Sequence, residues 1–599
     1  QIFKLIKDSK MTKRKQKQNN DSNNTDTETE SRNSNSSKLG RPSTGVWNFF
    51  KRGQPKGDGH WEGTCDYCGT FYPHAKPQNL RAHLANNCKK VPEEWRRHFN
   101  YIIANNLEDI PTDEPLSNAT SSLFKQKKIA KQPALTNWYD SATIDASRQL
   151  LIDEAITLAF IMCGIPFRVI NNPFFVSALN LLNPGYSVPS REVLSGRLLD
   201  TEVAKVIHKV DKILEHASNL AIGLDGWTAP NGLSIWNFVI MTPSRQEYLY
   251  ELANYSDQSH TGEFLANQIE LIINRIGKDK ISAIISDNGS NVASARRIIC
   301  SKYRNILNIR CIAHCFNLIS KDIIRHTFAE KIIQRANKLV GFFKKSHKAA
   351  AILNQKILQY QVSGGGLKTY VETRWTTVHE CVSSIVRLKN CLEEIRENHS
   401  EFISPTILAI LRSRGFFIDM QYLSDVLLPI REAILAVEAN CAGLKFGTFP
   451  LIANYAGRVW QQMGKQSKSC ETLITQLRIY KEQKKFINGI PNPYTAPYTI
   501  GNDTPLMWWN TCEVKPNHLQ RLAIKLFSIT PSSAICERMF SALGWIYGKH
   551  RTRLNVDRLE GLAKVYRFNL SNPIEQLRHT QITEVTPEIM TNIAETVFK

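Results

Sequence analysis

The sequence predicts a multidomain α+β protein, and three observations support that prediction. The chain has 599 residues, about four times the length of a typical domain. Apolar residues make up 42% and charged residues 22%, the ordinary balance of a protein with sizeable buried cores. Along the chain, the hydrophobic pattern changes from helical spacing to short strand-like runs and back again. We therefore expect a small zinc-binding module, a helical domain, a mixed α/β core and further helical regions.

The charge of the chain favours a polyanionic partner. Lys and Arg total 76 against 54 Asp and Glu, which gives a formal net charge of +22. Such a surplus favours nucleic acid, because basic side chains that neutralise phosphates release counterions. No apolar run reaches the ~18–20 residues that span a bilayer, so we expect no integral membrane segment. Thirteen cysteines are too sparse for a disulfide scaffold, which indicates a reducing compartment and one metal site.

Residues 1–38 are predicted to form a disordered tail of basic and polar residues. They contain too few apolar side chains to offset the entropy of ordering. The opening QIFKLIKDSK has no long apolar stretch and no small-residue cleavage site, so a secretory signal is not expected. The basic cluster Lys13–Lys17 suits either a nuclear import signal or a solvated charge run. With a DNA partner, the expected location is the nucleus.

Residues 39–100 shift to aromatic residues, Gly and Cys, and they predict a zinc-binding module. Cys65-x2-Cys68 supplies two thiolates, and His83-x4-Cys88 supplies an imidazole and a third thiolate. This spacing suits one tetrahedral Zn²⁺, whose binding contributes about 10–16 kcal/mol to the folding of so small a domain. Chance spacing or a redox pair are the alternatives.

Two further features refine this module. Leu80 and Leu84 lie on the helix expected around the histidine and should pack beneath the metal site. His74 is a competing ligand, but Pro73 beside it suits a turn.

Trp47-x2-Phe50, placed ahead of the Cys/His set, resembles the BED-type zinc finger, a DNA-binding module, over about residues 41–95. The resemblance implies that the helix enters a DNA groove and reads base edges, while nearby cations contact phosphate. The implied base-reading residues are Gln78, Asn79 and Arg81, and the implied phosphate contacts include Lys51 and Arg52. For the aromatic residues, core packing is the alternative, and both interpretations can hold together.

The regions after the finger alternate between polar and periodic sequence. Residues 101–134 are rich in Pro, Ser, Asn and charge, which indicates a linker. Residues 135–218 have helical apolar spacing, interrupted at Gly164 and Pro166, which predicts a helical domain.

Residues 219–321 predict a mixed sheet flanked by helices. Short apolar runs bounded by turn residues are typical of strands, and longer periodic stretches between them are typical of helices. The expected elements are strands at 220–224, 235–240 and 248–255, a helix at 262–276, a strand at 281–286, a helix from about 291, and a strand at 309–313.

Two carboxylates follow strands of this predicted sheet. Asp225 in LDGWT stands at the end of the first strand, and Asp287 in SDNGSN stands at the end of the fourth. If these strands are neighbours, the carboxylates converge at one edge and can share divalent metals, which take hard oxygen ligands. Two such ions support phosphoryl transfer. Taken singly, each Asp also suits a turn or a helix cap.

The rest of the chain predicts mainly helix. Residues 322–500 repeat apolar side chains every three or four positions. Residues 501–575 carry further apolar helix faces, in which Trp508 and Trp509 suit either a partner or the chain's own core. Residues 576–599 are expected to be a tail.

Several motifs together resemble the hAT superfamily of DNA transposases in order and spacing. They are LDGWT, SDNGSN, the Cys-x2-His pair running into CFNLIS, ETRW, and the C-terminal CERMFSALG followed by KHRTRL. With the BED-like finger, the resemblance spans residues 41–570. It implies an RNase H-like catalytic core interrupted by a large helical insertion, followed by a C-terminal dimerisation region.

The resemblance also implies a set of catalytic residues. Asp225, Asp287 and Glu537 are implied to hold two Mg²⁺ or Mn²⁺ ions, with Glu537 returning from a helix after the insertion. His314 is implied to lie near the scissile phosphate, with the cysteine of its pair structural. An ordinary helical Glu537 paired with Arg538 is the alternative from the local sequence.

Further residues are implied to contact DNA. Arg374 and Trp375 match the RW pair of the family, where the tryptophan stacks on a base flipped out of the flanking DNA. A core Trp beside a surface Arg is the alternative. Lys549, Arg551 and Arg553 in KHRTRL are implied to hold phosphates near the acidic residues.

Three functions remain open from the sequence. A metal-dependent transposase would bind terminal inverted repeats through the finger and residues 135–218, cleave both strands through a flanking hairpin, and join the excised 3′-hydroxyl to target DNA. A domesticated relative would keep the fold and act as a catalytically silent transcriptional or chromatin regulator. A zinc-finger nuclease with an RNase H-like core is the third. The three acids are all present and KHRTRL is retained, which favours the transposase, expected as a homodimer or higher oligomer.

Overall fold

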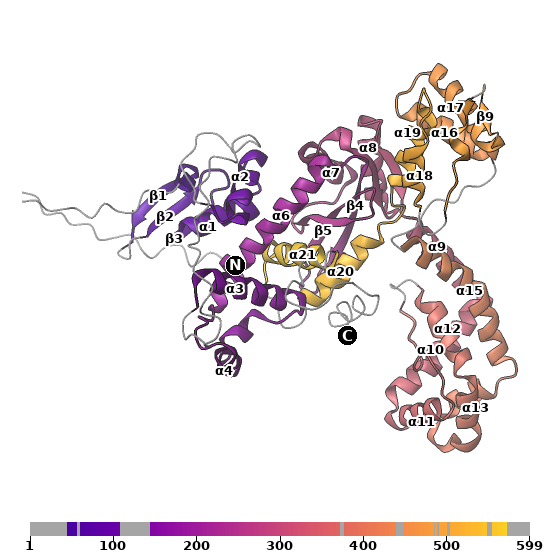
Figure 1. The fold of residues 1–599 in the computed structure, drawn as a ribbon. Helices are drawn as coiled ribbons and strands as arrows, with labels where there is room; N and C mark the ends of the chain where they lie inside the picture. The colour runs from indigo at the N-terminus through magenta and orange to yellow at the C-terminus, as the bar shows by residue number, and fades with distance from the viewer. Residues whose placement is uncertain are drawn as a thin grey trace, which may run out of the picture. The chain divides into compact units, whose positions relative to one another are not determined.

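A computed structural model describes most of the chain between residues 45 and 571 (Figure 1). The fold of the described residues is mixed α/β and mostly helical, with a three-stranded sheet, a five-stranded sheet and a two-stranded ribbon. The described residues are 45–56, 60–107, 144–371, 376–438, 449–483, 485–487, 490–499, 503–547 and 554–571. The predicted tails at 1–38 and 576–599, most of the predicted linker, and the sites at Arg374, Trp375, Lys549, Arg551 and Arg553 lie outside them.

Residues 45–107 form a small domain with a three-stranded antiparallel sheet in the order β1-β2-β3. Phe49 and Phe50 are buried with Leu80 and Leu84, which confirms the predicted packing beneath the Cys/His set. The elements are η1 (Gly45–Phe49), β1 (Phe50–Pro55), β2 (Trp61–Cys65), β3 (Phe71–Ala75), α1 (Pro77–Ala82), η2 (His83–Asn87) and α2 (Glu93–Ala104).

The turn predicted at Pro73 and His74 is wrong. Both residues lie in β3, which is an edge strand of the sheet. An edge strand tolerates proline because its outward N–H is not needed for pairing. The side chain of His74 is exposed and does not belong to the Cys/His group.

The next region is helical, as the apolar spacing predicts. α3 ends before Gly164, whose φ of +63° favours glycine and whose missing side chain leaves room for Trp545. α6 buries Val203 and Val210 against the central core. The elements are α3 (Ala146–Met162), η4 (Phe167–Asn171), α4 (Pro173–Leu182), α5 (Arg191–Val193), η5 (Leu194–Leu198) and α6 (Leu199–His216).

The five-stranded sheet has the order β6-β5-β4-β7-β8. β4, β5 and β6 are antiparallel, whereas β4, β7 and β8 are parallel, which confirms the predicted mixed sheet. α8 packs on β7 and β8, and α20 packs on β4 and β5; Figure 1 shows α7 and α8 on one side of the strands and α20 and α21 on the other. The elements are β4 (Leu220–Thr228), β5 (Ser234–Met241), β6 (Glu247–Asn254), α7 (Gly262–Ile276), η6 (Lys278–Lys280), β7 (Ile281–Ser286), α8 (Ser290–Lys302) and β8 (Leu307–Arg310).

Two predicted strand ends need correction. β4 continues to Thr228, so Asp225 lies inside the strand rather than at its end, because β5 pairs with β4 along its whole length. β8 ends at Arg310 rather than at Ala313, because Cys311 caps the helix that begins at Ile312.

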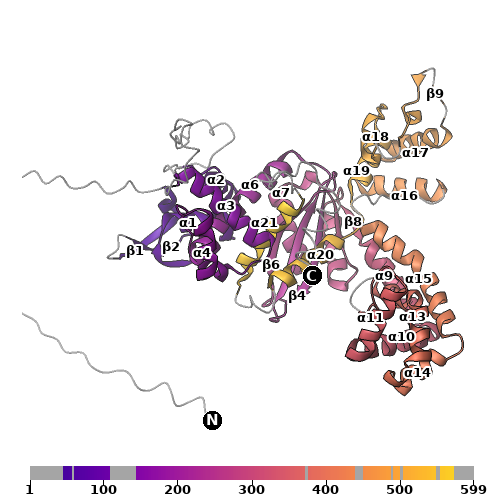
Figure 2. The same ribbon diagram turned by 60° about the horizontal axis from the view of Figure 1, so that its bottom comes forward.

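α9 follows β8 in the sequence and packs beside α15 (Figures 1 and 2). α15 and the helices between it and α9 bury a core of their own around Ile332, Ile385 and Leu427. The elements are α9 (Ile312–Ile324), α10 (Thr327–Lys345), α11 (His347–Gln359), α12 (Thr377–Arg387), α13 (Lys389–Asn398), η7 (Ser400–Phe402), α14 (Pro405–Arg412) and α15 (Phe416–Glu438).

The C-terminal helices join the core of the sheet. Trp509 is buried and Trp508 partly buried, and both pack against Tyr480 of the same chain, so these aromatic residues serve the chain's own core. None of the described helices has both the length and the apolar character needed to cross a membrane. The elements are α16 (Phe449–Gln462), α17 (Ser467–Glu482), β9 (Phe486–Ile487), β10 (Ile490–Pro491), η8 (Pro493–Thr495), α18 (Pro505–Thr511), α19 (His518–Ser528), α20 (Ala534–Tyr547) and α21 (Val556–Ser571).

Candidate functional site

The Cys/His set forms one compact group of metal-ligating atoms. The ligand atoms of Cys65, Cys68, His83 and Cys88 all lie within 4.8 Å of one another. The sulfur atoms of Cys65 and Cys88 are 3.9 Å apart, and bonds of about 2.3 Å to one tetrahedral zinc ion place two sulfurs about 3.8 Å apart. The sulfur of Cys68 lies 3.1 Å from Nε2 of His83. This cluster has the composition and the spacing of a zinc site.

A π-turn sets the spacing of the last two ligands. η2 runs over His83–Asn87 as a π-helix, and the backbone N–H of Cys88 donates to the carbonyl of His83 at 2.7 Å. This bond spans five residues instead of the four of an α-helix, so the four residues between the ligands close one wide turn. The sequence predicts one helical turn between His83 and Cys88, and the structure shows that this turn is of the π type.

The ionisation behaviour of the cluster also fits a cation. Burial raises the pKa of the Cys65 thiol to about 12, and it raises the pKa of Cys88 as well. Burial acts in the same direction on Cys68, but hydrogen bonding with Thr70 holds its pKa below the ordinary value. Burial lowers the pKa of His83 to about 4, so its imidazole is neutral and can serve as a ligand. Two buried thiolates need a positive ion beside them to be stable.

The side chains proposed from the resemblance to read or contact DNA lie on two parts of the finger. Lys51 and Arg52 are exposed on β1, where the Arg52 guanidinium lies 4.7 Å from the ring centre of Trp47. Gln78 and Asn79 are exposed on α1, and Arg81 is half-buried there.

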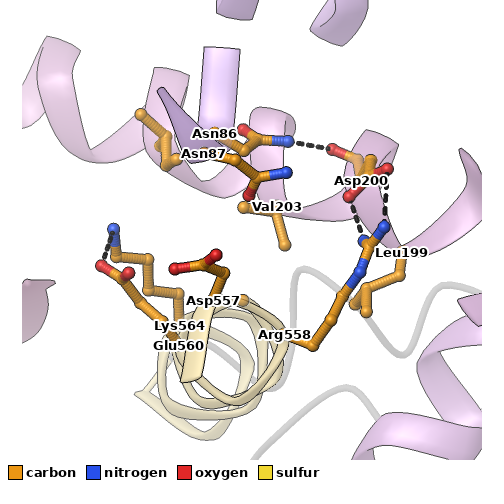
Figure 3. A pocket seen from close by; sticks show the side chains of 11 residues that line it. Asn86, Asn87, Leu199, Asp200, Val203, Asp557, Arg558, Glu560 and Lys564 are labelled. Atoms are coloured by element: carbon orange, nitrogen blue, oxygen red, sulfur yellow. Dashed lines mark hydrogen bonds and ion pairs between the residues drawn. The ribbon is translucent and has the colours of Figure 1, made fainter. Parts of the chain in front are cut away.

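All three α1 residues border a cavity of about 260 Å³ whose other wall includes polar and charged residues of α6. The finger also meets the core beside Asp200 of α6 (Figure 3). Asn86 donates to the carbonyl of Asp200, and Arg558 of α21 forms a two-pronged ion pair with its carboxylate. Burial raises the pKa of Asp200 although Arg558 acts in the opposite direction.

The carboxylates of Asp225 and Asp287 belong to two neighbouring strands or their ends. β4 and β7 are parallel, and their last paired residues are Gly223 and Ile285. Asp225 and Asp287 each stand two residues further on, Asp225 within β4 and Asp287 directly after the end of β7, and neighbouring strands lie about 4.8 Å apart. The predicted convergence of these two residues at one place in the sheet agrees with this register.

The electrostatics of this pair favour a bound cation. Burial and the charge of Asp287 raise the pKa of Asp225 to about 7, against a hydrogen bond from the N–H of Gly226. A dication between the two groups would offset both effects, and carboxylate oxygens are the ligands that Mg²⁺ and Mn²⁺ prefer. The donor set therefore fits a divalent metal ion.

Glu537 reaches the same region from the C-terminal part of the chain. It lies in the first turn of α20, and the side chain of Asn237 in β5 donates to the carbonyl of Cys536 at 2.9 Å across 299 positions of sequence. The Cys536 thiol has a strongly raised pKa because of burial and then of the charge on Asp225, with Glu537 contributing as well. α20 approaches β4 closely because Gly223 has no side chain. A Cβ at this position would lie 3.3 Å from the sulfur of Cys536.

From the local sequence, the alternative to a catalytic Glu537 was an ordinary helical glutamate paired with Arg538. Arg538 forms an ion pair with Glu247 of β6 at 3.4 Å, and Arg567 of α21 pairs with the same carboxylate. The guanidinium of Arg538 therefore helps to fix α20 to the edge of the antiparallel half of the sheet.

Cys311 joins the strand ends to the segment before α20. Its N–H donates to the carbonyl of Ser286 at 2.9 Å, and its buried sulfur accepts from the N–H groups of His314 and Ser533 at 3.4 Å each. The N–H of Ile312 donates to the carbonyl of Pro531. The cysteine is thus structural, and it places His314 in the first turn of α9, beside the strand that leads to Asp287.

Arg296 of α8 is a functional candidate that our sequence reasoning missed. Its side chain is 1% exposed and donates to the hydroxyl of Ser286, to the backbone carbonyl of Asp287 and to Asn308. These bonds fix the backbone that carries Asp287. The signal was present in the sequence, because Arg296 shares the apolar face of α8 with Val292 and Ile299.

Three models of known protein families match parts of the chain. Residues 189–339 match a domain of unknown function (DUF659), residues 309–409 match the ZBED1 RNase-like helical domain, and residues 499–567 match the hAT family C-terminal dimerisation region. A search of curated proteins gives no match.

The fold and the site define a multidomain α/β protein with one cluster of potential metal ligands among the described residues, the Cys/His set, and a pair of electrostatically coupled aspartates in its larger sheet. The three family matches indicate an hAT-family transposase or a ZBED-like protein. The match to the dimerisation region also supports self-association.

Proposed function

We propose that the protein is a DNA-binding hAT-type transposase that cleaves and joins DNA strands with divalent metal ions at Asp225, Asp287 and Glu537. The observation that carries this proposal is the matching register of the two aspartates, one within β4 and one directly after β7, with α20 packed across β4. Phosphoryl transfer requires little covalent chemistry from a protein, so positioned carboxylates supply most of what the chain must contribute.

We assign the five-stranded sheet to an RNase H-like core. Its order, with three antiparallel strands followed by two parallel ones, supports the assignment, as does the arrangement of helices on both faces. The helices from α10 to α17 would then be the insertion that separates the two aspartates from Glu537. The match of residues 309–409 to an RNase-like helical domain is consistent with this division.

Each part of the acidic centre has a proposed role. Mg²⁺ or Mn²⁺ held by the three acids would activate the attacking oxygen and stabilise the leaving oxygen. Arg296 holds the backbone of Asp287 in place. His314, fixed through Cys311, would lie beside the reacting phosphate.

The Cys/His cluster would hold a structural Zn²⁺ in a BED-type finger. Its donor set and its spacing support this assignment. We propose that Lys51 and Arg52 contact phosphates and that Gln78, Asn79 and Arg81 read bases. Residues 135–218 would add DNA contacts or self-association, and the protein would act in the nucleus as a dimer or higher oligomer.

A cleavage assay tests the catalytic part of this proposal. Purified full-length protein is mixed with DNA that carries the inverted repeats flanking its reading frame, with Mg²⁺, with Mn²⁺ or with EDTA. We expect metal-dependent strand cleavage, and a loss of at least about 1,000-fold in Glu537→Gln and in Asp225→Asn. Asp257→Asn, which removes an exposed acid elsewhere, should cleave like wild type.

The outcomes separate the open functions. Persistent cleavage in Glu537→Gln would remove that residue from the site. Tight binding of the repeats by a folded dimer that never cleaves would contradict the transposase proposal and favour the catalytically silent regulator.

A further inference from the structure

α10 and the segment after it form a strongly basic part of the helical region. Residues 331–371 contain eight Lys or Arg and no Asp or Glu. In the whole chain about one residue in eleven is acidic, so a stretch of this length would ordinarily contain about four acidic residues. The local excess of positive charge therefore comes from both added cations and missing anions.

Three lysines of α10 line up on one face. Lys331, Lys338 and Lys345 are seven residues apart, and a helix turns by about 20° less than two full turns over that spacing. With a rise of 1.5 Å per residue, they form a row about 21 Å long. All three side chains are exposed, whereas Ile332 and Leu339 face the helical core.

These lysines differ from the other cations nearby. Arg335 lies 3.8 Å from Asp419, Lys356 pairs with Glu394, and Lys348 lies over the ring of Phe402. Among the described residues, no ion pair or hydrogen bond involves the side chains of the three aligned lysines. Their charges are available to a partner that brings negative charge.

The C-terminal turn of α10 contacts residues that follow in the sequence. Lys344 donates to the hydroxyl of Thr369. Thr377, just after the RW pair, donates to the carbonyl of Val371. These two bonds connect the helix that carries the lysine row with residues Thr369, Val371 and Thr377 of the same helical region.

We propose that the lysine row of Lys331, Lys338 and Lys345 binds the phosphate backbone of duplex DNA. The inference rests on the proposed DNA-binding function and adds a surface outside the finger and the acidic centre. A row about 21 Å long matches about six base pairs at 3.4 Å each. Such contacts carry no sequence information, so the row would orient the duplex while other parts of the protein recognise it.

The test compares the salt dependence of binding in two triple variants of the full-length protein. Fluorescence anisotropy with a labelled 30-base-pair duplex of arbitrary sequence gives the affinity between 50 and 200 mM salt. Replacing the three lysines by Gln, which preserves helix propensity, should reduce the salt slope by about 2.7. Wild-type affinity should then fall about 40-fold more over this range than that of the variant.

The matched control removes the same charge from another surface. Lys278→Gln, Arg297→Gln and Arg304→Gln combine three exposed cations around α7 and α8. This control should keep the wild-type slope within about one unit. An equal loss in both triples would overturn the inference, because net charge alone would explain it.

Other outcomes are equally decisive. If wild type binds the duplex and the lysine variant keeps its slope, this inference fails while the proposed function stands. If wild type binds no duplex at any salt concentration, the proposed function fails as well. If the triple lysine variant loses binding to a 30-nucleotide RNA but binds the DNA duplex as wild type does, the inference is also overturned. Unchanged circular dichroism and melting temperature verify that both triples are folded.

Discussion

The Cys/His cluster and the carboxylate centre both suit cations, but they are assembled in opposite ways. The four ligands of the cluster lie within 23 sequence positions of each other, in a small domain with a short sheet. The carboxylates come from β4, from the residue that follows β7, and from α20, and a hydrogen bond that holds α20 on the sheet joins residues 299 positions apart. We therefore expect the folding of the small domain to depend on an ion at the cluster, whereas the contacts of the core hold the carboxylates in place without one.

The largest expected effect is on the cluster. Cys65→Ser should unfold residues 45–107, because zinc binding supplies about 10–16 kcal/mol in domains of this kind. Zinc content and hydrogen exchange measure the loss, and the five-stranded sheet should keep its protection. Cys163→Ser, which changes an exposed cysteine, is the matched control. A protected finger in zinc-free Cys65→Ser would contradict the dependence on the ion.

The carboxylate centre should instead depend on protein contacts. Arg296→Met leaves the acceptors at Ser286, Asp287 and Asn308 without their donor, so unfolding free energy should fall by about 2–3 kcal/mol. Denaturant unfolding measures this change without added metal. Arg297→Met, its exposed neighbour on α8, should change stability by less than about 0.5 kcal/mol. Equal effects of the two substitutions would show that the buried contacts are not what holds the Asp287 backbone.

Asp225→Asn should stabilise the protein in a way that depends on pH. Asp225 titrates near 7 in the folded chain and near 3.9 when unfolded, so its wild-type contribution is fully present below about pH 4 and is lost as pH rises to about 7. The variant should therefore gain about 1–2 kcal/mol over wild type at pH 8, after allowance for solvent screening. Melting temperatures from pH 4 to 8 measure the gap.

Added Mg²⁺ sharpens this prediction, because a dication should stabilise wild type and narrow the gap at pH 8. A gap that is constant from pH 4 to 8 would show that the charge of Asp225 is not its cause.

The smallest expected effect lies at the edge of the finger. Arg52→Met removes a cation from the face of Trp47, and such contacts at exposed sites contribute about 0.5–1 kcal/mol. Thermal release of zinc from the finger should move down by a few degrees at most. Lys51→Met, its exposed neighbour, should leave that transition unchanged. Unfolding of residues 45–107 in Arg52→Met would show that the Cys/His cluster is not the main source of stability of this domain.

The sequence predicts the locally encoded features well. The Cys-x2-Cys and His-x4-Cys spacings are sufficient to identify the cluster, and short apolar runs are sufficient to locate the strands of the mixed sheet. The end of β8 was misplaced because the apolar Ile312 and Ala313 continue the strand pattern, while the cap at Cys311 depends on the sulfur accepting an N–H from the next turn.

The features that escaped prediction depend on distant contacts. The extension of β4 past Asp225 follows from pairing with β5, which local pattern does not reveal. The role of Arg296 follows from its burial beneath the Asp287 backbone, where an arginine is unusual. The approach of Glu537 to the sheet was inferred only from family resemblance, because no local spacing relates it to residues on β4.

The pairing of α9 with α15 has a consequence for how such proteins diversify. In the segment from α9 to α15, α15 and the helices between it and α9 bury a core of their own. The two ends of this segment lie side by side. Lengthening such a segment therefore costs little chain entropy, about 0.6 kcal/mol for each doubling of its length. Descendants of one ancestor can therefore acquire longer, shorter or wholly different helical segments here while the register of β4 with β7 stays unchanged.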